Sequence, residues 1–288
     1  MASTVSEAFT ELRSRLEITN LQQSTVSERQ QNVRSAVESH LKVLDSFLTG
    51  SYSRHTMIAP LTEADIDIFI VLHHEYYADN GQANLLDLIK RVLRNTYPRT
   101  PDISRNGQAV TIQFNDFAVD VVPAFYREGG GYLIPNSVRQ TWIATDPKRH
   151  VEILTEANAK HSGDLVPLIK MAKGWNRNIN RHFHSFHLEV LALQVLDNVT
   201  ISNFPSGARY FFDKGRSHIR AKNPDPAGYG GDVGAYLNTN PKIEDAVSRF
   251  ETAYDRAIQA EDFERRGYIP SAIDMWGKIF GQYFPSYG

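Results

Sequence analysis

The sequence contains no cysteine, and this absence excludes several kinds of chemistry at once. Disulfide bridges, zinc sites with thiolate ligands and cysteine nucleophiles all need a sulfhydryl group. No function that depends on a thiol is therefore open to this chain.

Long apolar runs and a strong net charge are also missing. No segment approaches the roughly 18 consecutive apolar residues of a membrane-spanning helix, and residues 1–18 carry charges throughout, unlike a secretory signal. The formal net charge is only −2, whereas proteins that bind long nucleic acids usually show a basic excess or a basic face. We expect a cytoplasmic protein with no membrane partner, in which any polyanion is bound locally.

Two different patterns follow each other along the 288 residues. Short β-branched runs dominate the first half, and after residues 129–131, a triple glycine, the apolar residues recur at helical spacing. The strand-like runs cover residues 64–72, 110–114 and 117–122, and the helical ones residues 85–93, 165–175, 185–196, 243–264 and 273–283. We predict an α+β fold, with a mixed-sheet lobe and a long N-terminal helix at residues 1–145 and a helical lobe at residues 146–288.

Local signals place some of the boundaries. Ser27 and Gln30 have the spacing of a capping box and predict that the long N-terminal helix opens there. Residues 115–116 join two strand-like runs as a tight hairpin, and Gly267 is placed to end a helix. The segment 205–234, rich in Gly, Pro and Asp, is expected to be the longest irregular stretch.

Two aspartates interrupt the first strand-like run. Asp65 and Asp67 are separated by one residue, so in a strand both side chains point to the same face. Neighbouring carboxylates repel each other and persist only if they are exposed, protonated or neutralised by a cation. If Asp120 of the later hairpin joins them, three carboxylates can hold two Mg²⁺ or Mn²⁺ ions about 3.5–4 Å apart, as phosphoryl transfer requires. Asp120 can also accept the proton of an attacking hydroxyl.

A corner of small residues precedes these aspartates. Gly50 allows the backbone to approach a phosphate closely, and Ser51 adds a hydroxyl beside the N–H groups of a helix start. Taken singly, the corner is typical of an ordinary turn, and an Asp-x-Asp triplet is typical of an exposed strand end. The combination favours a nucleotide site.

Three histidines lie close together in the second half, at His182, His184 and His187. Such a cluster suggests a metal site, but histidines beside Arg181 more often face solvent or bond to backbone. We expect no metal there.

The order of these motifs resembles the signature of polymerase-beta-like nucleotidyltransferases. Segments of the second half resemble, more closely, the bacterial synthases of cyclic oligonucleotide second messengers that act in anti-phage systems, relatives of cyclic GMP-AMP synthase and oligoadenylate synthase. These segments are residues 170–176, 185–189, 225–226 and 231–233. The similarity begins near residue 30 and spans nearly the whole chain, and it implies an active site in the cleft between the two lobes.

The resemblance implies roles for the residues of the first lobe. Gly50 and Ser51 would hold the triphosphate of the donor nucleotide. Asp65 and Asp67 would bind both metal ions. Asp120 would bind one metal ion and the acceptor hydroxyl.

The resemblance also implies roles in the helical lobe. Lys173 and Ser185 would reach the β and γ phosphates, and Phe186 would stack on a base, a contact worth about 1–3 kcal/mol. Asp225 matches a position near the base. Without the order of the motifs, Lys173 would be interpreted as part of a solvated helix face and Phe186 as part of the core.

The implied function is the joining of two or three NTPs, ATP among them, into a cyclic di- or trinucleotide with release of pyrophosphate. The alternatives are a linear oligonucleotide synthase, a terminal transferase acting on RNA, transfer of NMP to a protein or tRNA, and an inactive nucleotide-binding scaffold.

The partners follow from the same resemblance. The animal cyclic GMP-AMP synthase grips DNA with a zinc finger, which a chain without cysteine cannot build, so no large nucleic-acid activator is expected. Gly288 permits conjugation through the C-terminus, but a frayed terminus is the interpretation that we favour, and a regulatory protein partner is a further hypothesis.

Overall fold

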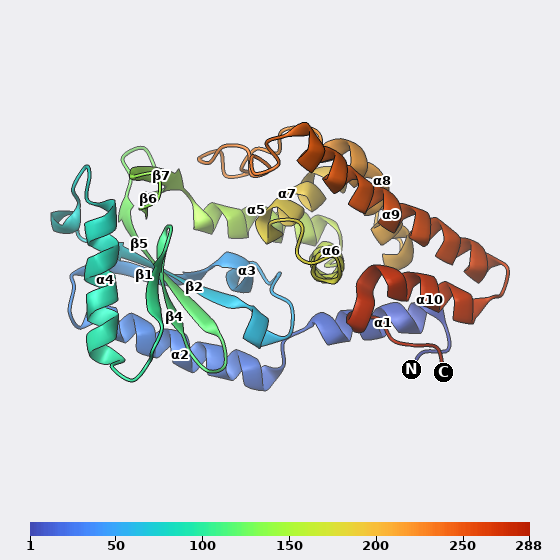
Figure 1. The fold of residues 1–288 in the computed structure, drawn as a ribbon, viewed down its shortest axis with the longest axis horizontal. Helices are drawn as coiled ribbons and strands as arrows, with labels where there is room; N and C mark the ends of the chain where they lie inside the picture. The colour runs from blue at the N-terminus through green and yellow to red at the C-terminus, as the bar shows by residue number, and fades with distance from the viewer. The chain divides into compact units, whose positions relative to one another are not determined.

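The computed structural model describes all residues from 1 to 288, and they divide into two compact units. One unit, here the sheet unit, comprises residues 18–151, and the other, the helical unit, comprises residues 1–17 and 152–288 (Figure 1). The sequence predicts a single boundary between residues 145 and 146. The chain instead passes between the units twice, so the first 17 residues belong with the helices and not with the sheet.

The sheet unit contains a seven-stranded mixed sheet. Its strands are β1 (Val43–Thr49), β2 (Asp65–Leu72), β3 (Ile103–Asn106), β4 (Ala109–Gln113), β5 (Ala118–Tyr126), β6 (Tyr132–Asn136) and β7 (Thr141–Thr145). The order is β1-β2-β5-β4-β3, with β6 joined to β5 and β7 joined to β6. Strands β2 and β5 are parallel and every other pair is antiparallel.

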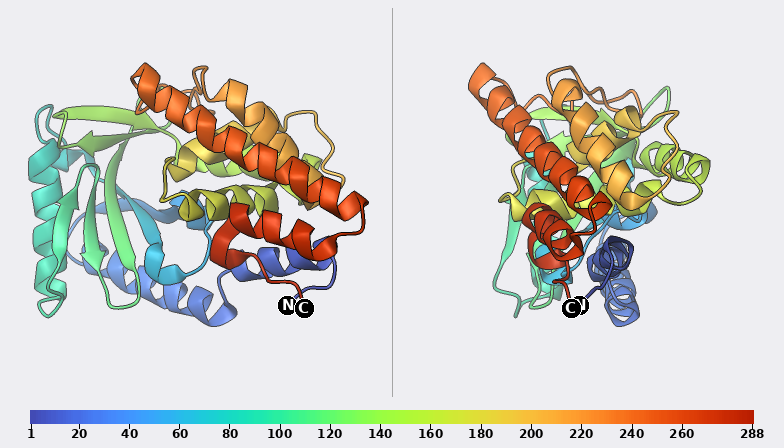
Figure 2. Two further views of the ribbon diagram at one scale, coloured as in Figure 1. Left: turned by 45° about the vertical axis from the view of Figure 1, so that its right-hand side comes forward. Right: turned by 90° about the vertical axis from the view of Figure 1, so that its right-hand side faces the viewer.

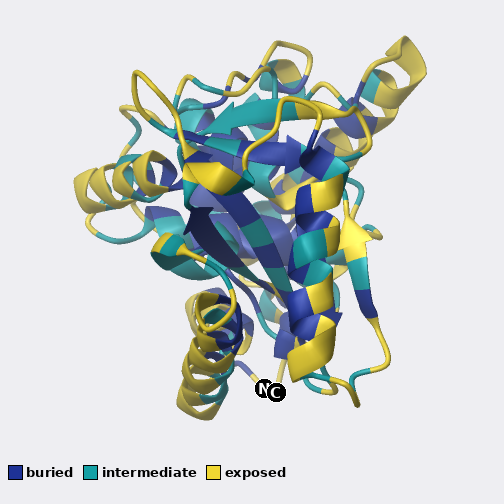
Figure 3. Ribbon diagram, turned by 90° about the vertical axis from the view of Figure 1, so that its left-hand side faces the viewer, coloured by how far each residue is buried: buried dark blue, intermediate teal, exposed yellow.

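The two faces of this sheet are buried in different ways. One face packs against α2 (Asn20–Glu38) and α4 (Gln82–Thr96), and alternate residues of β2 and β5, such as Ile66, Ile68 and Val121, join that core. In Figure 3 the central strands are dark blue, and the outward sides of the helices are yellow. The opposite face has a smaller apolar cluster around Phe69 and Tyr132. A sheet with unequal faces leaves room on the second face for polar groups.

The helical unit is built from α1 and the helices after residue 152. Its elements are α1 (Val5–Leu16), the end of α5 (Pro147–Lys160), α6 (Leu165–Asn178), α7 (Ser185–Val195), α8 (Phe204–His218), α9 (Asn240–Arg265) and α10 (Ile269–Phe280). Helix α1 belongs here because its apolar side carries Phe9, whose ring meets the edges of Trp276, Phe280 and Phe284 at centroid distances of 4.9–5.8 Å. None of the helices combines the length and the apolar character that crossing a bilayer needs.

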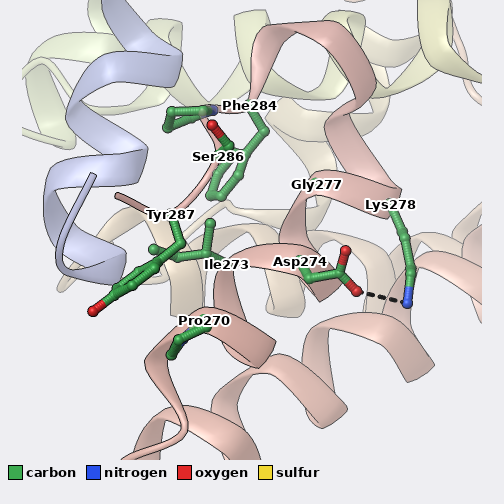
Figure 4. A pocket seen from close by; sticks show the side chains of 9 residues that line it. Pro270, Ile273, Asp274, Gly277, Lys278, Phe284, Ser286 and Tyr287 are labelled. Carbon is green, nitrogen blue, oxygen red and sulfur yellow. Dashed lines mark ion pairs between the residues drawn. The ribbon is translucent and has the colours of Figure 1, made fainter. Parts of the chain in front are cut away.

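The two ends of the chain lie side by side (Figure 2). The main-chain N–H of Ala2 donates to Ser286 O at 3.0 Å, and that of Gly288 donates to Ala2 O at 3.3 Å. The expectation of a frayed C-terminus is therefore wrong, because backbone hydrogen bonds hold the last residues. An open pocket of about 480 Å³ lies beside this tail and is lined by residues of α10 and of the tail, among them the ion pair of Asp274 and Lys278 (Figure 4).

Several local predictions are confirmed. Strand β2 covers the predicted run, and β4 and β5 form a hairpin around residues 115–116. Helix α9 ends at Arg265, and Gly267 follows with a φ of +81°, which a glycine adopts at little cost.

Other local predictions are wrong. Helix α2 begins at Asn20, because Thr19 and Gln22 form the capping box, and Ser27 lies inside the helix. Helix α8 occupies half of the segment predicted as irregular, since Asn203 caps its first turn. Strands β6 and β7 were missed after the triple glycine.

Candidate active site

Three carboxylates share the less covered face of the sheet. Asp65 and Asp67 alternate with buried isoleucines on β2, and the parallel pairing places Asp67 directly opposite Asp120 of β5. Paired residues of adjacent strands point to the same face. The structure therefore brings the three predicted acidic residues to one end of two neighbouring strands.

The environment of Asp120 shows how close these charges are. Burial raises the pKa of Asp120, a hydrogen bond from Thr111 lowers it, and the negative charge of Asp65 raises it again. Thr111 lies opposite Asp120 on β4, and its hydroxyl donates to Asp120 Oδ1 at 2.5 Å. A half-buried carboxylate that lies near a second negative charge is stabilised when a cation binds beside it.

The oxygen atoms of Asp65, Asp67 and Asp120 suit a hard divalent ion in their chemistry, but they do not surround a single point as metal ligands do. All three side chains offer oxygen only, which suits Mg²⁺ or Mn²⁺. No three acidic, histidine or cysteine side chains of the chain are gathered closely enough to hold a metal ion. Metal binding at these residues is therefore a proposal.

The Gly50–Ser51 corner lies against the second aspartate. Thr49, the last residue of β1, pairs with Asp67, and the short helix α3 (Gly50–Ser53) starts directly after it. Gly50 has a φ of +68°, and a Cβ atom on it would lie 1.7 Å from Asp67 Oδ2. Only glycine fits at this contact, and the corner and the carboxylates thus belong to one site in the sheet unit.

In the helical unit, Lys173 is neither solvated nor exposed. It projects from α6 and forms an ion pair of 2.6 Å with Glu189 of α7, and both side chains are at most 5% exposed. Glu189 was missed by the sequence analysis, although an acidic residue in the apolar run of α7 was a usable signal. The interpretation of Lys173 as part of a solvated helix face is wrong.

Removing one partner of this pair should destabilise the fold. A Lys173→Met variant leaves the Glu189 carboxylate buried without its charge partner, and we expect the free energy of unfolding to fall by about 3 kcal/mol. Urea denaturation followed by circular dichroism measures this loss. A Lys173→Met/Glu189→Leu double variant should recover most of it, and a double variant as unstable as the single one would contradict the explanation.

The other predicted residues of the helical unit lie at the start of α7 and in a loop. Ser185 is the first residue of α7 and is exposed, and Phe186 is half-buried. Asp225 is buried, and its carboxylate accepts the main-chain N–H groups of Ala227 and Gly230 at 3.2 and 2.6 Å. The carboxylate of Asp225 therefore holds its own loop in shape.

His187, one of the three clustered histidines, is almost fully buried. Burial lowers its pKa to about 4, while the charge of Asp232 raises it and that of His184 lowers it further. The expectation that these histidines face solvent or bond to backbone is wrong for His187, whose Nδ1 lies 3.0 Å from the hydroxyl of Tyr236.

The lowered pKa of His187 predicts how stability depends on pH. In the unfolded chain the imidazole titrates near 6.5 and in the folded chain near 4, so the unfolded state binds more protons between these values. Stability should fall as the pH drops from 6.5 to 4, by about 3 kcal/mol from this group. Denaturant titrations at several pH values should show a shallower fall for His187→Asn than for wild type. A variant of the exposed His40, His40→Asn, should follow wild type, and parallel curves for all three proteins would contradict the prediction.

Comparison with known proteins gives a consistent result. The model of the Second Messenger Oligonucleotide or Dinucleotide Synthetase domain matches residues 3–158. A "Probable cyclic nucleotide synthase" of Bacillus cereus (strain VD146) is 29% identical, over 83% of this chain and 81% of its own length. The "Cyclic AMP-AMP-AMP synthase" of Acinetobacter sp. (strain ATCC 27244 / 9458) is 25% identical, over 98% and 86%.

A solved structure shares the fold. CdnC of E. coli MS115-1, in its complex with HORMA-deltaN, superposes with a TM-score of 0.78 over 98% of both chains, at 18% identity. At that identity the likeness concerns the fold alone. The chain therefore has the fold of CdnC.

Proposed function

The chain belongs to the family of Second Messenger Oligonucleotide or Dinucleotide Synthetases, which are nucleotidyltransferases, and on this premise we propose that it joins two or three NTPs into a cyclic oligonucleotide. Pyrophosphate leaves at each step, and the product serves as a second messenger of anti-phage defence. The observation that carries the proposal is the meeting of Asp65, Asp67 and Asp120 on one face, with Gly50 against Asp67.

The carboxylates supply the chemistry of the reacting centre. Two Mg²⁺ ions bound by Asp65, Asp67 and Asp120 would neutralise the charge that develops on the phosphoryl oxygens. Asp120 takes the proton of the acceptor hydroxyl. The hydrogen bond from Thr111 holds Asp120 in the orientation for that transfer.

The remaining predicted residues bind the nucleotide. The N–H groups and hydroxyl of the Gly50–Ser51 corner hold the donor triphosphate. Lys173 neutralises the charge of the β and γ phosphates, and Ser185 forms a hydrogen bond with them. Phe186 stacks on the base. Lys173 reaches a phosphate by exchanging its contact with Glu189, which holds the ammonium group in place in the absence of substrate.

The comparisons support one substrate and one kind of partner. ATP is proposed as a substrate because the Acinetobacter relative is named for a product made of AMP units. A regulatory protein is proposed as a partner because the E. coli structure was solved as a complex with another protein. Conjugation through Gly288 is less well supported, since the tail would first have to release its hydrogen bonds to Ala2.

Incubation of the pure protein with each labelled NTP and Mg²⁺ tests the function. We expect pyrophosphate and a small product that resists phosphatase, and mass spectrometry of that product gives its bases and ring size. A phosphatase-sensitive product would favour a linear synthase, and label on protein or RNA would favour a transferase acting on macromolecules. Absence of any product with all four NTPs would reject the proposal.

A further inference from the structure

Three rings surround the start of helix α7, and the reaction proposed above uses none of them. Tyr236 comes from the segment before α9, and His184 and His187 flank the residues that open α7. The ring of Tyr236 stacks on that of His184 at a centroid distance of 3.8 Å and an angle of 23°. Segments about fifty residues apart in the sequence are thereby joined at one point.

The hydroxyl of Tyr236 makes two contacts there. It accepts the main-chain N–H of His184, the N-cap residue of α7, at 3.2 Å. It also lies 3.0 Å from Nδ1 of His187. With the oxygen accepting the N–H of His184, the hydroxyl proton is free to be donated to Nδ1, and we assign to His187 the tautomer that carries its proton on Nε2.

Tyr236 and His187 are both uncharged near neutral pH. Burial raises the pKa of Tyr236 to about 12 and lowers that of His187 to about 4. The hydrogen bond between them therefore does not change with pH near neutrality, and it acts as a fixed element of the structure.

The surroundings of His187 are shaped to hold the ring in place. Its Nε2 is buried and has no hydrogen-bond partner, which is costly for a polar atom. A Cβ on Gly234 would come within 2.9 Å of the ring, so the neighbouring backbone closes directly over it. Asp232 accepts the N–H groups of Asn223 and Gly234 and fixes that backbone. His187 therefore keeps the contact of Nδ1 with the hydroxyl of Tyr236, although its Nε2 has no hydrogen-bond partner.

This arrangement controls the two residues that lie between the histidines. Ser185 and Phe186 follow directly after the N-cap that Tyr236 binds, and both precede His187 in the first turn of α7. We propose that Tyr236 and His187 are positioning residues, which fix the direction in which α7 presents Ser185 and Phe186 to the donor nucleotide. The inference rests on the proposed function, because it needs a nucleotide at these two side chains.

Removing the phenol hydroxyl tests the proposal. Tyr236→Phe keeps the ring on His184 but loses both hydrogen bonds, and we expect the Kd for a bound nucleotide to rise about tenfold. The probes are the α,β-methylene analogues of ATP and GTP, measured by calorimetry with whichever wild type binds. Turnover at saturating NTP should change less than twofold, since the reacting carboxylates are untouched, so KM rises and kcat does not.

Matched variants separate positioning from general destabilisation. Tyr283→Phe also removes a buried hydroxyl of the helical unit, the acceptor for Arg177, and should leave the Kd unchanged. His187→Leu should weaken binding like Tyr236→Phe, whereas His187→Asn, whose amide oxygen can replace Nδ1 as acceptor, should bind within about twofold of wild type.

Two results would overturn the proposal in different ways. If Tyr236→Phe and His187→Leu melt at a lower temperature but bind the analogue as wild type does, the cluster is only structural. If wild type binds neither analogue and forms no product, the proposed function and this inference both fail.

Discussion

An Asp65→Asn/Asp67→Asn double variant is expected to lose nucleotidyl transfer by at least about 10³-fold while remaining folded. Two carboxylates that share a face would each contribute to charge stabilisation in the transition state, and an effect of this kind amounts to about 4 kcal/mol. Pyrophosphate release from the NTPs that wild type uses measures the loss. The melting temperature should stay within a few degrees, because the substitution removes repulsion and changes little volume.

The control for this variant is a carboxylate of the same unit. Asp87→Asn removes a charge that pairs with Arg105 at the surface, and its activity should equal that of wild type. Product formation by the pure double variant within tenfold of wild type would refute the assignment of Asp65 and Asp67 as metal ligands.

Gly50→Ala is expected to damage stability and activity together. The alanine Cβ would overlap Asp67 Oδ2, and the φ of +68° is itself unfavourable for a residue with a side chain. We expect the free energy of unfolding to fall by about 4 kcal/mol, from backbone strain and overpacking combined. Activity of the folded fraction should fall on the order of 10²-fold, because Asp67 must move away.

A second glycine separates the two causes. Gly107 has a φ of +60° but has no atom within 4 Å of the position of an added Cβ, so Gly107→Ala carries the backbone strain without the collision. This variant should lose only about 1 kcal/mol and keep its activity. Equal losses in the two variants, measured by chemical denaturation, would show that the contact with Asp67 contributes nothing.

The acidic part of the site could be predicted from the sequence because its pattern is local. Asp65 and Asp67 interrupt an apolar strand, and the period of two along a strand places them on one face without further information. The contact of Thr111 with Asp120 could also have been predicted from the sequence. Counting outward from the turn at residues 115–116 pairs position 111 with position 120, so the partner of Asp120 follows from the hairpin alone.

The contacts of the candidate residues in the helical unit were less predictable, because they depend on how distant segments cross. The sequence marks Lys173 and Glu189 as charges in apolar helices, but only the packing of α6 against α7 pairs them. The contact of Tyr236 with His187 depends on the path of the loop before α9, for which no periodicity exists. Helix α1 shows an apolar stripe in the sequence, yet the stripe does not say which unit it covers.

The division of the chain has a consequence for synthesis on the ribosome. All of residues 18–151 emerge before most of the helical unit has been translated, so the sheet with its carboxylates can form early. Helix α1 emerges before the sheet unit, but Phe9 must wait for Trp276 and Phe280, which are translated after the sheet unit. The nascent chain thus contains Asp65, Asp67 and Asp120 before the helices that carry Lys173 and Ser185 have been translated, and α1 completes its packing only after α10 has emerged.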